Sequence, residues 1–145
     1  MDGISEILAT YNCVSLDEKI QFELDGVVEK EIKQAYCIEN LEFCVSCMDY
    51  TTLKVSDTEE SVKNFTADLL KKLKKFNLRD VAAVCVFSNY AGIVREGLKG
   101  TDIQTAVVAG NFPNSQTFTE IKLAECKMAI GAGAQEVDVV ISVGD

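Results

Sequence analysis

Apolar residues follow the chain in short, near-continuous runs that alternate with spacings of three and four residues. These runs cover residues 43–48, 81–87, 103–109 and 136–143, and the run at 81–87 is unbroken. Runs of this length, bounded by polar turn residues, predict four buried β-strands. We expect the first strand to carry Asp49 at its end, on the same face as Cys47 and Val45.

Helical spacing follows three of these runs. The apolar residues at helical spacing are Val62, Phe65, Leu69, Leu73 and Phe76, then Tyr90, Ile93, Val94 and Leu98, then Ile121, Ala124 and Met128. Apolar strands that alternate with amphipathic helices predict an α/β fold with a parallel sheet. The pattern leaves two architectures open, an open doubly wound sheet or part of a (β/α)8 barrel.

The ends of two helices carry further signals. Ser56 with Glu59 and Thr117 with Glu120 have the spacing of capping boxes, and Gly133 is placed to close the last helix. The first of these helices ends in a run of lysines. Such a run on a helix end predicts a solvated face. These lysines are Lys71, Lys72, Lys74 and Lys75.

Residues 1–41 differ from the rest of the chain because they are polar and acidic. Apolar residues such as Ile20, Leu24 and Ile32 recur there at near-helical spacing. We therefore divide the chain into an N-terminal helical extension, residues 1–41, and a partial barrel, residues 42–145.

Composition narrows the classes of protein that fit. The chain has 145 residues, 48% of them hydrophobic, a net charge of −9 and no histidine. The acidic balance disfavours nucleic acids and anionic membranes as partners. We expect a cytoplasmic protein with reduced cysteines, because no run is long enough to span a bilayer and the start lacks the pattern of a signal peptide.

Two carboxylates are candidates for chemistry because they lie on predicted strands. Asp138 shares a strand face with Val140 and Ser142, where burial of an unpaired charge would be costly. It is either an acid–base group or a structural aspartate held by backbone amides. Asp49 would point toward the same space, or would only cap the turn that follows it.

The cysteines offer weaker candidates. Cys44 and Cys47 are three residues apart, which on a strand points them to opposite faces, so we expect neither a metal site nor a redox role. Cys85 is either a small core residue or a thiol facing the pocket.

Four motifs together resemble deoxyribose-phosphate aldolase. They are Met48–Leu53, Val81–Val86, Asn111–Pro113 and Gly133–Val140. The resemblance, over about residues 42–144, implies the N-terminal half of a (β/α)8 barrel. It also implies a class I aldolase that cleaves 2-deoxy-D-ribose 5-phosphate to D-glyceraldehyde 3-phosphate and acetaldehyde in deoxynucleoside catabolism. Such an enzyme works through a lysine Schiff base and needs no cofactor or metal.

The resemblance also assigns roles to individual residues. It implies that Asp138 acts in a proton relay and that Asp49 lies at the edge of the same pocket. Thr51, Leu53 and Phe112 match positions that line the pocket, and Cys85 is a possible pocket thiol. No role carries over to Tyr50.

The lysines implied by the resemblance would follow Asp145, on the sixth and seventh strands. No lysine of this chain falls on a predicted strand, so we expect the isolated chain to be inactive. A half barrel would also leave two sheet edges open, which predicts a homo-oligomer or association through those edges.

Two other functions stay open. One is a non-catalytic half-barrel that binds a ligand or a partner through the face that carries Asp49 and Asp138. The other is an open-sheet signalling domain whose aspartates bind Mg²⁺.

Overall fold

The computed structural model describes residues 7, 10 and 13–144, with residues 13–17 described by their backbone alone. The chain divides into two compact units, residues 1–41 and 42–145. In the first unit, α2 (Cys13–Val27) continues into a π-helical turn, η1 (Val28–Ile32), and a short helix, α3 (Lys33–Ala35). Many of its apolar side chains are exposed, Phe22 to 80%.

The second unit is built on a four-stranded sheet. Its strands are β1 (Asp49–Thr51), β2 (Ala83–Phe87), β3 (Gln104–Ala109) and β4 (Glu136–Val139). They lie in the order β1-β2-β3-β4 and all pairs are parallel. The parallel sheet predicted from the apolar runs is therefore confirmed, with strands shorter than the runs.

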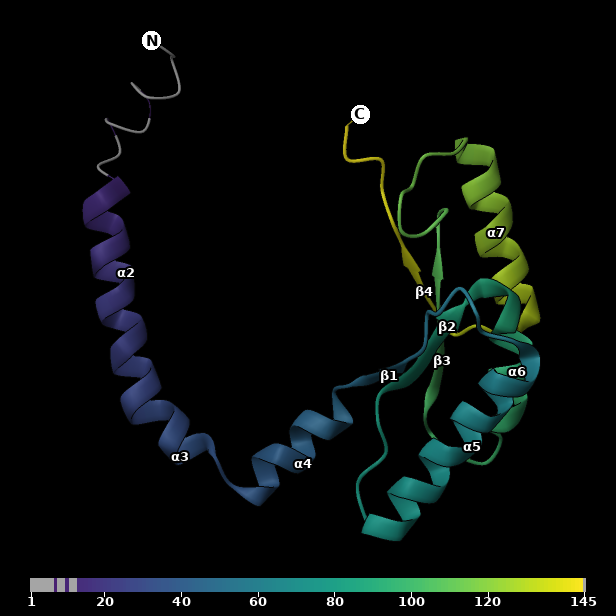
Figure 1. Ribbon diagram of the computed structural model, residues 1–145, viewed down its shortest axis with the longest axis horizontal. Helices are drawn as coiled ribbons and strands as arrows, with labels where there is room; N and C mark the ends of the chain where they lie inside the picture. Colours follow the sequence, from purple (N-terminus) through teal and green to yellow (C-terminus); the bar gives the residue numbers. More distant parts are fainter. Residues whose placement is uncertain (1–6, 8–9, 11–12, 145) are drawn as a thin grey trace. The chain divides into compact units, whose positions relative to one another are not determined.

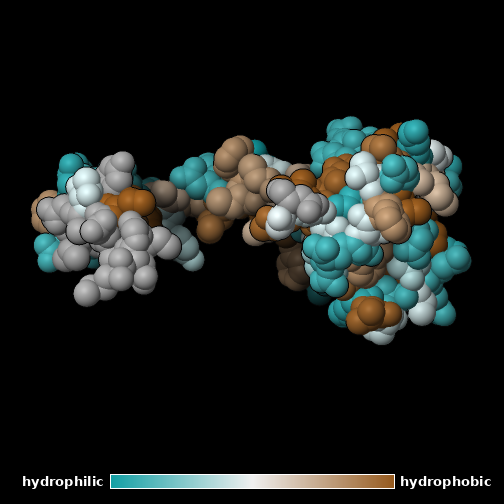
Figure 2. Space-filling model, turned by 90° about the horizontal axis from the view of Figure 1, so that it is seen from above, coloured by the Kyte–Doolittle hydropathy of each residue, from teal (hydrophilic) through white to brown (hydrophobic). Residues whose placement is uncertain are grey.

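Three helices cover one face of this sheet. They are α5 (Glu59–Phe76), α6 (Ala91–Gly97) and α7 (Thr119–Ala132), and a 3-10 turn, η2 (Ser88–Tyr90), precedes α6. All three lie on the same side of the strands (Figure 1). The main core fills the space between them and the sheet, with Val62, Val84, Val94 and Val107 fully buried. Apolar side chains also remain at the surface (Figure 2).

The strand predicted for residues 43–48 is wrong, because most of this segment belongs to a helix, α4 (Ile38–Ser46). A short apolar run does not distinguish a strand from a helix by periodicity alone. Here Val45 packs on the core while Phe43 is 61% exposed. Pairing with β2 begins only at Met48, whose carbonyl accepts a hydrogen bond of 2.9 Å from the Ala82 amide.

Both predicted capping boxes are misplaced. The cap of α5 is Thr58, whose side chain and that of Ser61 bond each other's backbone amides. The residue before α7 is Phe118, which makes no side-chain cap bond. The C-terminal prediction is confirmed, because Gly133 ends α7 with a φ of 111°.

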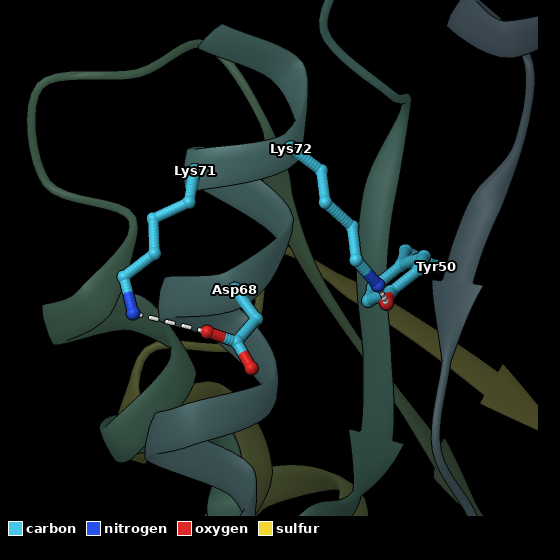
Figure 3. Close-up of polar contacts among 4 residues, drawn as sticks. All are labelled: Tyr50, Asp68, Lys71 and Lys72. Carbon is cyan, nitrogen blue, oxygen red and sulfur yellow. Dashed lines mark hydrogen bonds and ion pairs between the residues drawn. The ribbon is translucent and has the colours of Figure 1, made fainter. Parts of the chain in front are cut away.

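The lysine run of α5 is exposed, as predicted. Lys71 pairs with Asp68 at 3.0 Å, and the Lys72 ammonium donates a 3.2 Å hydrogen bond to the Tyr50 hydroxyl (Figure 3). The Tyr50 ring stacks on Phe65 with centroids 4.3 Å apart. Tyr50 therefore faces the helices.

One buried hydroxyl predicts a stabilising substitution. Among the described residues, Thr105 Oγ1 is the buried side-chain polar atom with no hydrogen-bond partner. We expect Thr105→Val to raise the free energy of unfolding by about 1 kcal/mol, because the desolvated hydroxyl is replaced by a methyl group. Urea unfolding measures the change.

Thr66→Val is the matched control. Thr66 is equally buried, but its hydroxyl donates a 3.0 Å hydrogen bond to the Val62 carbonyl. This second substitution should not stabilise the chain. If both substitutions changed the free energy of unfolding equally, the unpaired hydroxyl of Thr105 would not be the cause.

Candidate active site

The face of the sheet opposite the helices carries the candidate residues. Side chains alternate along a strand, and the register pairs Thr51 with Cys85 and Val108 with Asp138. Asp49, Thr51, Cys85, Val108 and Asp138 therefore share this side, which we call the Cys85 face. The structure brings both candidate carboxylates to one face, although Asp49 does not continue a strand that contains Cys47 and Val45.

The two carboxylates are exposed on this face. For Asp138 this corrects the premise that its strand is buried. β4 is an edge strand of the sheet, and the Asp138 side chain is exposed there. Burial therefore does not explain Asp138 here, and the informative observation is that it lies on the same face of the sheet as Cys85.

Cys85 is the buried centre of the face, with 6% of its surface exposed. It packs in a small apolar cluster to which Leu53 and Phe112 contribute. Burial raises the pKa of the Cys85 thiol above its ordinary 9.0, and the charges of Asp49 and Asp138 raise it further. A hydrogen bond with Thr51 acts in the opposite direction on this pKa. The predicted site residues therefore lie on or against the Cys85 face.

The raised pKa of Cys85 predicts a specific loss of stability in alkali. A thiol whose pKa is higher in the folded state stabilises that state fully below the unfolded pKa of about 9.0. This contribution is lost as the pH rises through the folded pKa. We expect the stability advantage of the wild type over Cys85→Ala to shrink above pH 9, as measured by urea unfolding across pH 7 to 10. A difference that does not vary with pH would contradict this.

The loop after β1 is held by Asp57, which sequence reasoning missed. Its carboxylate accepts hydrogen bonds from the Thr52 hydroxyl at 2.8 Å and from the Lys54 amide at 3.0 Å. Its carbonyl accepts another from the Tyr90 hydroxyl at 2.6 Å. These bonds fix the segment that carries Thr51 and Leu53. The only signal in the sequence is an aspartate shortly after a strand end, which is a common turn feature.

The loop after β3 is held by Glu125, which was also missed. One carboxylate oxygen accepts from the amides of Gly110 and Asn111 at 2.9 and 3.1 Å, and the other accepts from the Ser88 hydroxyl at 2.9 Å. Glu125 therefore ties the ends of β2 and β3 together beside Phe112. A cavity of about 800 Å³ adjoins these residues.

Lys122 fastens the other end of the same loop. Its ammonium donates to the hydroxyls of Ser115 and Ser142, and Ser115 in turn donates a 3.0 Å hydrogen bond to the Val140 carbonyl. The loop is thereby joined to the segment after β4. Lys122 and Glu125 are three residues apart on α7, so they project from the same side of the helix.

Three features are absent from the described residues. Every lysine lies in a helix, a turn or a loop, so no lysine is placed on a strand of the Cys85 face. The described residues contain no group of three or more histidine, cysteine or acidic side chains that could hold a metal ion. Nor is any described helix long and apolar enough to cross a membrane.

Comparison with known proteins gives a consistent set of relatives. Proteins named deoxyribose-phosphate aldolase from Clostridium novyi, Clostridium tetani and Streptococcus gordonii are 45%, 42% and 36% identical over 97 residues. These residues are 67% of this chain, and 40%, 41% and 40% of the three relatives. The chain thus spans about two fifths of the length of these curated relatives. No protein-family profile matches it.

Solved structures show the same relationship. The tetrameric deoxyribose phosphate aldolase from Aeropyrum pernix is 27% identical, with a TM-score of 0.57 over 71% of this chain and 41% of that chain. QR15, an aldolase, is 25% identical with a TM-score of 0.57 over 69% of this chain and 41% of that chain. Over two thirds of its length the chain is therefore similar to deoxyribose-phosphate aldolases, and its α/β sheet corresponds to part of their (β/α)8 barrel.

Proposed function

We propose that this chain forms part of an aldolase that cleaves 2-deoxy-D-ribose 5-phosphate to D-glyceraldehyde 3-phosphate and acetaldehyde through a lysine Schiff base. The observation that carries the proposal is the 45% identity to a deoxyribose-phosphate aldolase over 97 residues. The position of Asp49, Cys85 and Asp138 on one face of the sheet supports it, because these are residues that the resemblance assigns to the pocket.

In this proposal the chain supplies an acid–base group and part of the wall of the substrate pocket. Asp138 lies on β4 with its carboxylate exposed, where it can exchange protons with a substrate on the Cys85 face. We assign it the proton transfers that accompany imine formation and that occur at the acetaldehyde-derived carbon. Leu53 and Phe112 supply apolar walls, and Asp49 and Thr51 supply polar groups at the rim.

The attacking amine has to come from outside these 145 residues. A Schiff-base lysine needs a position facing the substrate, and the described lysines lie on helices, turns and loops. We infer that the remaining strands of the barrel supply it. The isolated chain should then give no covalent adduct with the substrate when it is treated with borohydride.

A chimera tests the proposal. The 97 residues of this chain that match the Clostridium novyi aldolase would replace the matching stretch of that enzyme. We expect the chimera to cleave the sugar phosphate and to form an adduct that borohydride traps. Circular dichroism and thermal unfolding would establish that the chimera folds. A folded chimera without activity would contradict the proposal and favour a half-barrel that only binds or assembles.

Self-association is part of the same proposal. The outer edges of β1 and β4 are unpaired among the described residues, and large apolar side chains such as Ile141 (74% exposed) lie at the surface. We expect the 145-residue chain to form oligomers in analytical ultracentrifugation at micromolar concentration. A monomer that stays stable on dilution would contradict this. We also propose that the protein works in the cytoplasm, as expected from the sequence.

A further inference from the structure

Cys44 and Cys47 form a pair that the proposed reaction does not use. The expectation that they point apart rested on a strand, and this segment is instead the end of α4. Cys44 lies in the last turn of α4, and Cys47 is the first residue after this helix. The Cys47 amide donates a 3.1 Å hydrogen bond to the Cys44 carbonyl, which keeps the turn closed. Residues three apart on a helix lie on the same face.

The spacing suits a disulfide. In helical geometry, Cα atoms three residues apart are about 5 Å from each other. Disulfides join Cα atoms roughly 4.4 to 6.8 Å apart. Both thiols are exposed, so a reagent in solution can reach them.

The helix end that carries the pair is anchored to its surroundings. Val45 packs against the main core, and Glu42 forms a 3.4 Å ion pair with Arg79. The Met48 carbonyl accepts the Ala82 amide at 2.9 Å. The two thiols are therefore carried on a fixed turn that leads directly into β1 (Figure 1).

We propose that Cys44 and Cys47 are a redox-active dithiol that closes to an intramolecular disulfide by exchange with small-molecule disulfides. One thiolate attacks a sulfur of the reagent and releases the first thiolate, leaving a mixed disulfide on the protein. The second cysteine attacks that mixed disulfide and releases the second thiolate. The protein dithiol loses two electrons and two protons, and the small disulfide is reduced to two thiols.

The redox state of this pair is linked to the Cys85 face, because the two cysteines lie just before β1 in the sequence. Cys47 is two residues before Asp49, so closing the disulfide cross-links the turn from which β1 begins. The reduced pair leaves this turn free of any covalent constraint.

Oxidation by glutathione disulfide tests the proposal on the full 145-residue chain. We expect peptide mapping of the wild type to show residues 44 and 47 joined, with the loss of two hydrogens and no retained glutathione. The variants Cys44→Ser and Cys47→Ser should instead retain one glutathione on the remaining thiol. Cys126→Ser is the control, because Cys126 lies on α7 and should not affect closure.

Binding of a trivalent arsenical gives a second, independent readout. Phenylarsine oxide bridges two adjacent thiols, and its second bond is intramolecular when the pair is close. We expect the wild type to retain it at about 100-fold lower concentration than either serine variant. A wild type that keeps glutathione on Cys44 or Cys47, or that joins one of them to another cysteine, would overturn the proposal. So would equal arsenical binding by all variants.

Discussion

Asp138→Asn should lower the turnover number of the chimeric aldolase by about 10²- to 10⁴-fold, which is the usual contribution of a positioned acid–base group. The asparagine keeps the size of the side chain but cannot accept or release a proton at neutral pH. Because asparagine and aspartate have the same shape, we expect the replacement to leave the thermal unfolding of the chimera nearly unchanged. Steady-state kinetics with 2-deoxy-D-ribose 5-phosphate measure the effect.

Asp68→Asn is the matched control for this prediction. Asp68 is also a surface carboxylate, but it pairs with Lys71 on α5, on the helix side of the sheet (Figure 3). It should leave turnover unchanged. If Asp138→Asn mainly raised KM and left the turnover number intact, the proton-transfer role would be wrong and a binding role would replace it.

Gly110→Ala should be the most destabilising of the glycine-to-alanine substitutions. We expect it to lower the free energy of unfolding by about 2–4 kcal/mol. Gly110 has a φ of +80°, which disfavours any side chain. A Cβ atom there would also lie 2.8 Å from the Val140 carbonyl oxygen and 3.1 Å from a methyl carbon of Val139. The backbone of β4 would have to move away from β3, which would weaken the 3.2 Å hydrogen bond from the Val140 amide to the Ala109 carbonyl.

Substitutions at two other glycines separate the cost of the positive φ from the cost of crowding against Val139 and Val140. Gly100 has a similar φ of +84°, but a methyl group added there would meet no atom within 4 Å, so Gly100→Ala should cost only about 1 kcal/mol. Gly131 lies within α7 with equally open space, and Gly131→Ala should stabilise the chain by about 0.5–1 kcal/mol. Urea unfolding of the three variants gives the comparison. Equal losses for Gly110→Ala and Gly100→Ala would show that crowding against β4 has no cost.

The sheet could be predicted from the sequence because its inner strands are buried on both faces. Val84 and Val107 are buried on the helix side, and Ala83 and Ala106 are buried on the Cys85 face. Strands buried on both faces require near-continuous apolar runs such as those in the sequence. The alternation of side chains along β4 also placed Asp138 on the correct face.

Other features depend on contacts that a local pattern does not encode. The run at residues 43–48 is apolar, yet only Val45 packs on the core and the backbone stays helical. Asp138 was expected to be buried, but burial depends on what covers the face of an edge strand. Glu125 reads as an ordinary helix carboxylate, and its role is visible only when the ends of β2 and β3 meet it.

The bonds of Lys122 and Glu125 limit how the connection between β3 and α7 can change in evolution. Loops usually tolerate insertions and deletions, since their length is free to vary. One residue inserted early in α7 would turn Glu125 by about 100° around the helix axis and move it from the amides of Gly110 and Asn111. We therefore expect homologues to keep Ser115 and the number of residues between Gly110 and Glu125, and to vary more freely at the exposed positions 114, 116 and 118.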